Sequence, residues 1–180
     1  MEGRFLLRDY GRQLWTREKA REIRSQLQEM LQNLNAGETL VIDVKGVEVF
    51  DYSFANEFFA KTLLSLPADH PGRFLVVENL TTYTRENLEQ TLESMGLAMI
   101  ERKGKTLRLL GKLHPADRMT FDAIARAKGP ITAAELSGQF DVHLTAMNER
   151  LSKLTRLALV RREKGTSPAG REQYLYTVLA

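Results

Sequence analysis

The stretch that decides the fold is residues 131–162, ITAAELSGQFDVHLTAMNERLSKLTRLALVRR. Its start predicts a short helix with a capping box, in which the Thr132 side chain accepts from the amide of Glu135 and the Glu135 side chain accepts from the amide of Thr132. A tight turn is expected at residues 140–142. A second helix of about four turns is indicated by apolar residues that recur at helical spacing, namely Leu144, Met147, Leu151, Leu154 and Ala158. Two helices joined at an angle by a short turn are therefore expected.

Two strands are predicted after this helix pair. Residues 159–162 form a basic strand, residues 165–170 a loop, and residues 173–178 an antiparallel partner strand. A preceding helix is expected to end at residues 128–130. The order of helix, turn, helix and two-stranded wing resembles the winged helix-turn-helix domain of the MarR and ArsR types of bacterial regulator. The resemblance implies a small α+β domain that binds duplex DNA.

The charge of the chain is unevenly distributed. Residues 1–112 hold 16 basic and 16 acidic side chains, whereas residues 113–180 hold 10 and 7. Residues 111–115 form a short segment that ends in a proline, which is typical of a linker. We expect a first domain at 1–112 and a second at 113–180, the latter carrying the positive excess suited to phosphates.

Composition argues against several classes of protein. The chain has no cysteine, which fits a cytoplasmic location, and nothing in its sequence indicates a signal peptide or a membrane span. A glycine-rich phosphate loop is not found, and the histidines His70, His114 and His143 are scattered. We therefore expect no catalytic residues, no metal and no cofactor, and a protein that is not an enzyme.

Strands and helices alternate in the first domain. Strands are predicted at residues 5–7, 40–44 and 74–77, and a hairpin turns at Lys103 and Gly104. Helices are predicted to begin with Thr16, Ser53 and Thr84 as caps, and the second of them to end before Pro67. This alternation is typical of an α/β domain with a mainly parallel or mixed sheet.

Asp43, Gly46 and Val47, followed by Asp51 and the run Ser53-Phe54-Ala55, resemble the STAS domain of anti-sigma-factor antagonists. They are closer still to the STAS-like domain of unassigned function found in bacteria and archaea. In the antagonist family a partner kinase phosphorylates the serine at the helix start, which implies Ser53 as a phosphorylation or partner site. The simpler alternative is that Ser53 is only a helix cap.

Asp43 also has two interpretations. A carboxylate near the end of a buried strand is a candidate base or ligand, but it can equally accept hydrogen bonds from the following turn. No second acid or histidine lies at a spacing from Asp43 that would indicate a catalytic pair or a ligand set, so the structural role is favoured.

Candidate DNA contacts lie on the second helix and the wing. On the helix face opposite the apolar stripe, Asn148 is suited to adenine and Thr145 to a thymine methyl or a phosphate. Lys153 and Arg156 are suited to the DNA backbone, and Glu149 to a cytosine amino group. The basic residues predicted on the wing are Arg161, Arg162, Lys164 and Arg171.

Together these patterns predict a prokaryotic transcription regulator that acts as a homodimer. Its STAS-like domain would sense a signal or bind a protein partner, and its winged helix would bind double-stranded DNA. The alternative is a signalling adaptor in a sigma-factor or kinase pathway, in which the winged helix docks protein. An enzyme in the first domain is a weaker third possibility.

Overall fold

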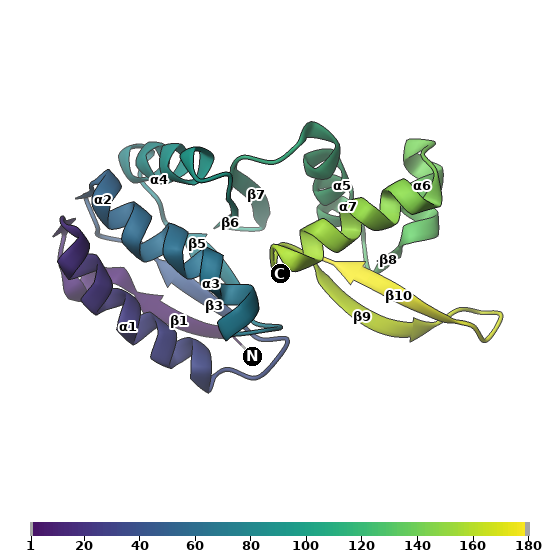
Figure 1. Ribbon diagram of the computed structural model, residues 1–180, viewed down its shortest axis with the longest axis horizontal. Coiled ribbons are helices and arrows are strands. Elements are labelled where there is room, and N and C mark those ends of the chain that lie inside the picture. The colour runs from purple at the N-terminus through teal and green to yellow at the C-terminus, as the bar shows by residue number, and fades with distance from the viewer. Residues whose placement is uncertain (1, 179–180) are drawn as a thin grey trace. The chain divides into compact units, whose positions relative to one another are not determined.

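The computed structural model describes residues 2–178 and divides the chain into two compact units, Met1–Leu113 and His114–Ala180 (Figure 1). The break falls one residue after the boundary expected from the sequence. None of the helices between residues 2 and 178 combines the length and the apolarity that a membrane span requires.

The first unit is built on a sheet that, within the described residues, has five strands in the order β1-β3-β5-β6-β7. The first four run parallel, and β7 pairs antiparallel with β6. A short parallel pair, β2 with β4, lies apart from this sheet. The strands are β1 (Glu2–Leu6), β2 (Gln13–Leu14), β3 (Thr39–Asp43), β4 (Val49–Phe50), β5 (Phe74–Glu78), β6 (Ala98–Lys103) and β7 (Thr106–Gly111). The prediction of a mixed α/β sheet is confirmed.

Helices connect the parallel strands and cover the sheet (Figure 1). They are η1 (Leu7–Tyr10), a 3-10 turn; α1 (Arg17–Asn33); α2 (Tyr52–Ala55), which continues through the π-helix η2 (Asn56–Ala60) into α3 (Lys61–Asp69); and α4 (Thr82–Ser94). Because consecutive parallel strands are neighbours and such crossovers are right-handed, these helices lie on one face of the sheet. Their apolar stripes meet the alternate side chains of the strands, and β3, buried along its whole length, forms the centre of the core.

Three details of these helices differ from the predictions. The cap of α2 is Asp51, not Ser53, because Asp51 has the extended backbone of a cap and its Oδ1 accepts from the Phe54 amide at 2.7 Å. The cap of α4 is Thr81, with Thr84 as the reciprocal partner of a capping box. Pro67 lies inside α3, in its last turn, where its missing N–H removes one intrahelical hydrogen bond.

The hairpin between β6 and β7 turns at Gly104 and Lys105, one residue later than expected.

The second unit places three helices beside a small sheet. The elements are α5 (Pro115–Arg126), β8 (Ile131–Thr132), α6 (Ala133–Phe140), α7 (Leu144–Arg156), β9 (Arg161–Thr166) and β10 (Glu172–Thr177). The strand order is β8-β10-β9, with both pairs antiparallel. The predicted capping box of α6 is confirmed, since Thr132 and Glu135 bond reciprocally.

The core of the second unit gathers the inner faces of its helices. It contains Phe121, Ile124, Leu136, Met147, Leu151, Leu154, Leu159, Val160 and Tyr176. The turn between α6 and α7 passes through Asp141 in the left-handed conformation. Two members of the predicted stripe lie elsewhere: Leu144, in the first turn of α7, is exposed, and Ala158 follows the end of the helix with a positive φ. The apolar stripe of α7 is therefore shorter than the sequence suggests.

Candidate functional site

The outward face of α7 carries the predicted polar residues. Thr145, Asn148, Glu149 and Arg156 are all exposed, and they lie opposite the buried stripe formed by Met147, Leu151 and Leu154. His143 caps the helix, with Nδ1 accepting from the Thr145 amide at 3.3 Å. This face is thus open to a partner.

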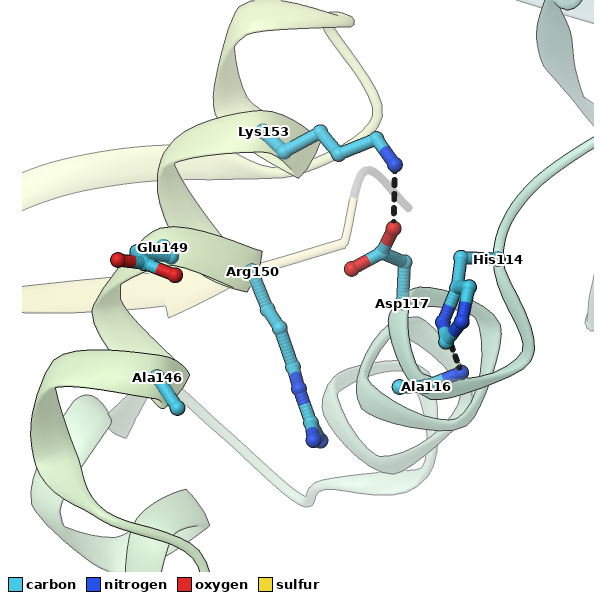
Figure 2. A pocket seen from close by; sticks show the side chains of 7 residues that line it. All are labelled: His114, Ala116, Asp117, Ala146, Glu149, Arg150 and Lys153. Atoms are coloured by element: carbon cyan, nitrogen blue, oxygen red, sulfur yellow. Dashed lines mark hydrogen bonds and ion pairs between the residues drawn. The ribbon is translucent and has the colours of Figure 1, made fainter.

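Lys153 lies differently from the other predicted contacts. Its Nζ donates to Oδ2 of Asp117 at 2.6 Å, and this ion pair joins α7 to the first turn of α5 (Figure 2). The side chain of Asp117 is only 8% exposed, so this carboxylate is largely buried between the two helices. The DNA-backbone contact of Lys153 stays a prediction; in this structure its ammonium is paired with a largely buried carboxylate.

The ion pair forms one wall of a pocket of about 340 Å³ between α5 and α7. Figure 2 shows the Arg150 side chain extending from α7 into the space beside α5, while the carboxylate of Glu149 points away from Asp117. Within residues 2–178, no ion pair involves Arg150. The sequence reasoning did not single out Arg150, although its position next to the buried Leu151 places it at the edge of the open face.

The β9–β10 ribbon separates its basic residues onto two faces. Side chains alternate along a strand, so Arg162 and Lys164 share one face, whereas Arg161 and Glu163 lie on the other. Nη1 of Arg161 is 4.0 Å from Oε1 of Glu163. The predicted set of wing residues is thus divided by the pleat of the ribbon.

An aromatic platform supports the exposed basic face of the ribbon. The guanidinium carbon of Arg162 lies 4.5 Å from the centroid of the Tyr174 ring, and Tyr174 is directly opposite Lys164. Such stacking orients a guanidinium without neutralising its charge. Arg171 is exposed in the loop, where its amide donates to Oγ of Ser167. Tyr174 was not anticipated; the alternation of tyrosines at 174 and 176 was the available signal.

The predicted partner site of the first unit lies at the start of α2. Asp51 is occupied as the cap, and the half-buried Ser53 is the second residue of the helix rather than its cap. Tyr52, between them, is exposed, and its hydroxyl lies 3.1 Å from Oγ of Ser94.

Asp43 has the structural role that the sequence favoured. Its Oδ1 accepts from the Lys45 amide at 2.9 Å and from Nδ2 of Asn79 at 2.8 Å, and its Oδ2 accepts from Arg4 at 2.8 Å. Burial alone would raise the pKa of Asp43, but these hydrogen bonds outweigh it and lower the pKa below its ordinary value. A carboxylate held in this ionised state joins the middle of β1 to the carboxyl ends of β3 and β5.

Metal-ligating side chains do not gather in the described part of the chain: no group of three or more His, Asp or Glu residues there is placed to hold an ion. The chemistry offered by these surfaces is hydrogen bonding and charge.

Comparisons with known proteins give a family match and a structural similarity. Residues 19–93 match the family described as a STAS-like domain of unknown function. A solved structure, a possible transcriptional regulator from Methanosarcina mazei Go1, is similar at 17% identity with a TM-score of 0.35. That match covers 38% of this chain and 57% of the other, and it is too weak to support an argument. The comparison with curated proteins gives no match.

Proposed function

We propose that this protein is a prokaryotic transcription regulator whose second unit is a winged helix-turn-helix domain that binds duplex DNA. The observation that carries the proposal is the exposed polar face of α7 in a unit that also presents a basic β-ribbon. The order α5, β8, α6, α7, β9, β10 supports this assignment, since it provides a helix-turn-helix followed by a two-stranded wing.

The proposed contacts divide into base and phosphate contacts. Asn148 and Thr145, in the first turns of α7, would contact base edges in the major groove, and Glu149 would accept from a cytosine amino group. Arg156, near the end of the helix, and the pair Arg162 and Lys164 on the ribbon would contact phosphates. Arg171 in the ribbon loop would add a further phosphate contact.

The first unit would be the sensory or protein-interaction domain. A phosphate on Ser53 would lie beside the Asp51 carboxylate, so modification would disturb the start of α2 by like-charge repulsion. A second copy of the chain is proposed because two recognition helices multiply affinity through effective concentration. We further propose that the protein acts in the cytoplasm and is not an enzyme.

Selection of bound sequences from a random duplex pool, followed by fluorescence anisotropy on the selected duplex, tests the proposal. Affinity should fall as salt rises, with a log-log slope of about −0.9 for each neutralised phosphate. Asn148→Ala should weaken binding to the selected duplex by roughly 1–3 kcal/mol and relax its base preference. Arg162→Ala with Lys164→Ala should flatten the slope.

The control for the ribbon variant is Lys128→Ala, which removes an exposed cation from the segment between α5 and β8. It should leave the slope close to that of the natural chain. A protein that enriches no sequence and binds no duplex at low salt would overturn the proposal.

A protein-docking adaptor is the second candidate, and a specific observation favours it. On α7 the cation Lys153 is neutralised by Asp117, and Glu149 adds a negative charge to the exposed face. That arrangement reduces the attraction of the helix for phosphates. Absence of DNA binding together with capture of a protein partner that is lost on Asn148→Ala would support the adaptor.

A further inference from the structure

A second pocket lies within the first unit, at the carboxyl ends of β5 and β6. Its volume is about 310 Å³. The lining residues are Asn79 and Leu80 after β5, Arg85 on α4, Glu101, Arg102 and Lys103 at the end of β6, and Gly104 in the hairpin turn. In open α/β sheets ligands bind outside the carboxyl ends of parallel strands, so the position is suited to a small molecule.

The Arg85 side chain is fixed in this pocket by a buried acid. Nε and Nη2 of Arg85 donate to the carboxylate of Glu101 at 2.5–3.0 Å, and Nη2 also donates to the Leu80 carbonyl at 3.2 Å. Glu101 is only 3% exposed. This bidentate pair holds the guanidinium in one orientation, so ordering it for a ligand costs little additional entropy.

Two further lining residues are anchored in the same way. Arg102 donates to both carboxylate oxygens of Glu2 at 2.8 Å and is also bonded to Glu78. Asn79, in the left-handed conformation, is fixed by the hydrogen bond from its amide to Asp43. The pocket is therefore preorganised, with acids supporting its polar side chains.

Donors remain for a ligand after these anchors are satisfied. Among residues 2–178, no hydrogen bond uses Nη1 of Arg85, and no ion pair engages the exposed Lys103. Of the three lining cations, Arg85 is paired with Glu101 and Arg102 with Glu2 and Glu78, so the unpaired charge in the lining is that of Lys103. An anion entering this space would replace water around the Lys103 ammonium and Nη1 of Arg85.

We propose that this pocket binds a small phosphate monoester. Nη1 of Arg85, on α4, and the ammonium of Lys103, on β6, come from two different elements and can each donate to a separate oxygen of a phosphate. A volume of about 310 Å³ leaves room for a small group attached to the phosphate. The site is independent of the proposed DNA binding, because it uses residues of the first unit alone.

The test is isothermal titration of the full chain with inorganic phosphate, and then with glycerol phosphate, at constant ionic strength. Lys103→Glu reverses a lining charge on an exposed side chain. Lys105→Glu is the matched control, because Lys105 is exposed in the same hairpin but does not line the pocket. Lys103→Glu should weaken phosphate binding by about tenfold or more, and Lys105→Glu by less than about twofold.

Two results would overturn the site. One is the absence of saturable binding of both phosphates by the natural chain; the other is an equal loss in the two variants, which would indicate only a diffuse surface charge. Asn79→Ala gives an independent check, since it removes a lining side chain without changing the charge and should also weaken binding. The duplex assay on the same proteins separates the two proposals, because Lys103→Glu should leave DNA affinity unchanged if only the anion site is lost.

Discussion

The ion pair between Asp117 and Lys153 gives a sharp prediction about DNA binding. Asp117→Asn keeps the shape of the side chain and removes its charge. Lys153 is 41% exposed, so its ammonium can then leave α5 and reach solvent or a phosphate. The proposed DNA-binding surface loses one negative charge and gains one free cation next to the face formed by Asn148 and Arg156.

The magnitude follows from counterion release. One additional neutralised phosphate makes the log-log salt slope steeper by about 0.9. Between 50 and 200 mM salt, that change alone multiplies the loss of affinity by about three- to fourfold. The cost in folding free energy should be on the order of 1 kcal/mol, because the lost hydrogen bond has one partly exposed partner.

Fluorescence anisotropy with the selected duplex, measured across a salt series, provides the assay. Asp122→Asn is the matched control: it removes the same charge from α5, but Asp122 has no ion pair within the described residues. Affinity at low salt should rise in Asp117→Asn above that of the control. An unchanged slope, or the same change in both variants, would refute the inference that Asp117 withholds Lys153 from DNA.

Three further predictions concern the stability of the fold. Arg85→Met leaves the buried Glu101 carboxylate unpaired and should lower the free energy of unfolding, measured in urea, by about 3–5 kcal/mol. The double variant Arg85→Met with Glu101→Met should regain most of this loss, and an equal loss in the double variant would contradict the prediction. Burial alone would raise the pKa of Glu57, but the hydrogen bond and charge of Lys61, with the charges of Arg24 and Arg21, outweigh burial and lower this pKa below its ordinary value. A carboxyl whose pKa is lowered in the folded state stabilises the fold above its unfolded pKa, and it loses that contribution as pH falls. Glu57→Gln should therefore flatten the acid side of the curve of unfolding free energy against pH. An unaltered curve would argue against a stabilising role for the ion pairs of Glu57 with Lys61 and the two arginines. Thr132→Ala should cost about 1 kcal/mol through loss of the α6 cap, seen by thermal unfolding, and no change would mean that the capping box contributes little.

The candidate sites were predictable where they depend on local spacing. Thr145, Asn148 and Arg156 lie outward because the apolar residues of α7 fix the opposite side of the same helix. Asp117, Arg150 and Tyr174 were not found in this way. A charged or aromatic residue has the same sequence signature whether it is solvated, paired or stacked, so their roles depend on which neighbours the fold supplies.

The sequence by itself determined the features that arise within a few residues along the chain. The capping box of α6 joins residues only three apart, and the apolar run of residues 40–44, broken only by Asp43, marks a buried strand without reference to its neighbours. Tertiary structure decided which of the two capping residues, Asp51 or Ser53, begins α2, since both have suitable side chains and only one has the extended backbone. It also decided the pairings of Asp117 with Lys153, Asp43 with Asn79, and Arg85 with Glu101. These bonds join residues 16 to 36 positions apart, and only the packing of helices and strands brings such distant groups within hydrogen-bonding distance.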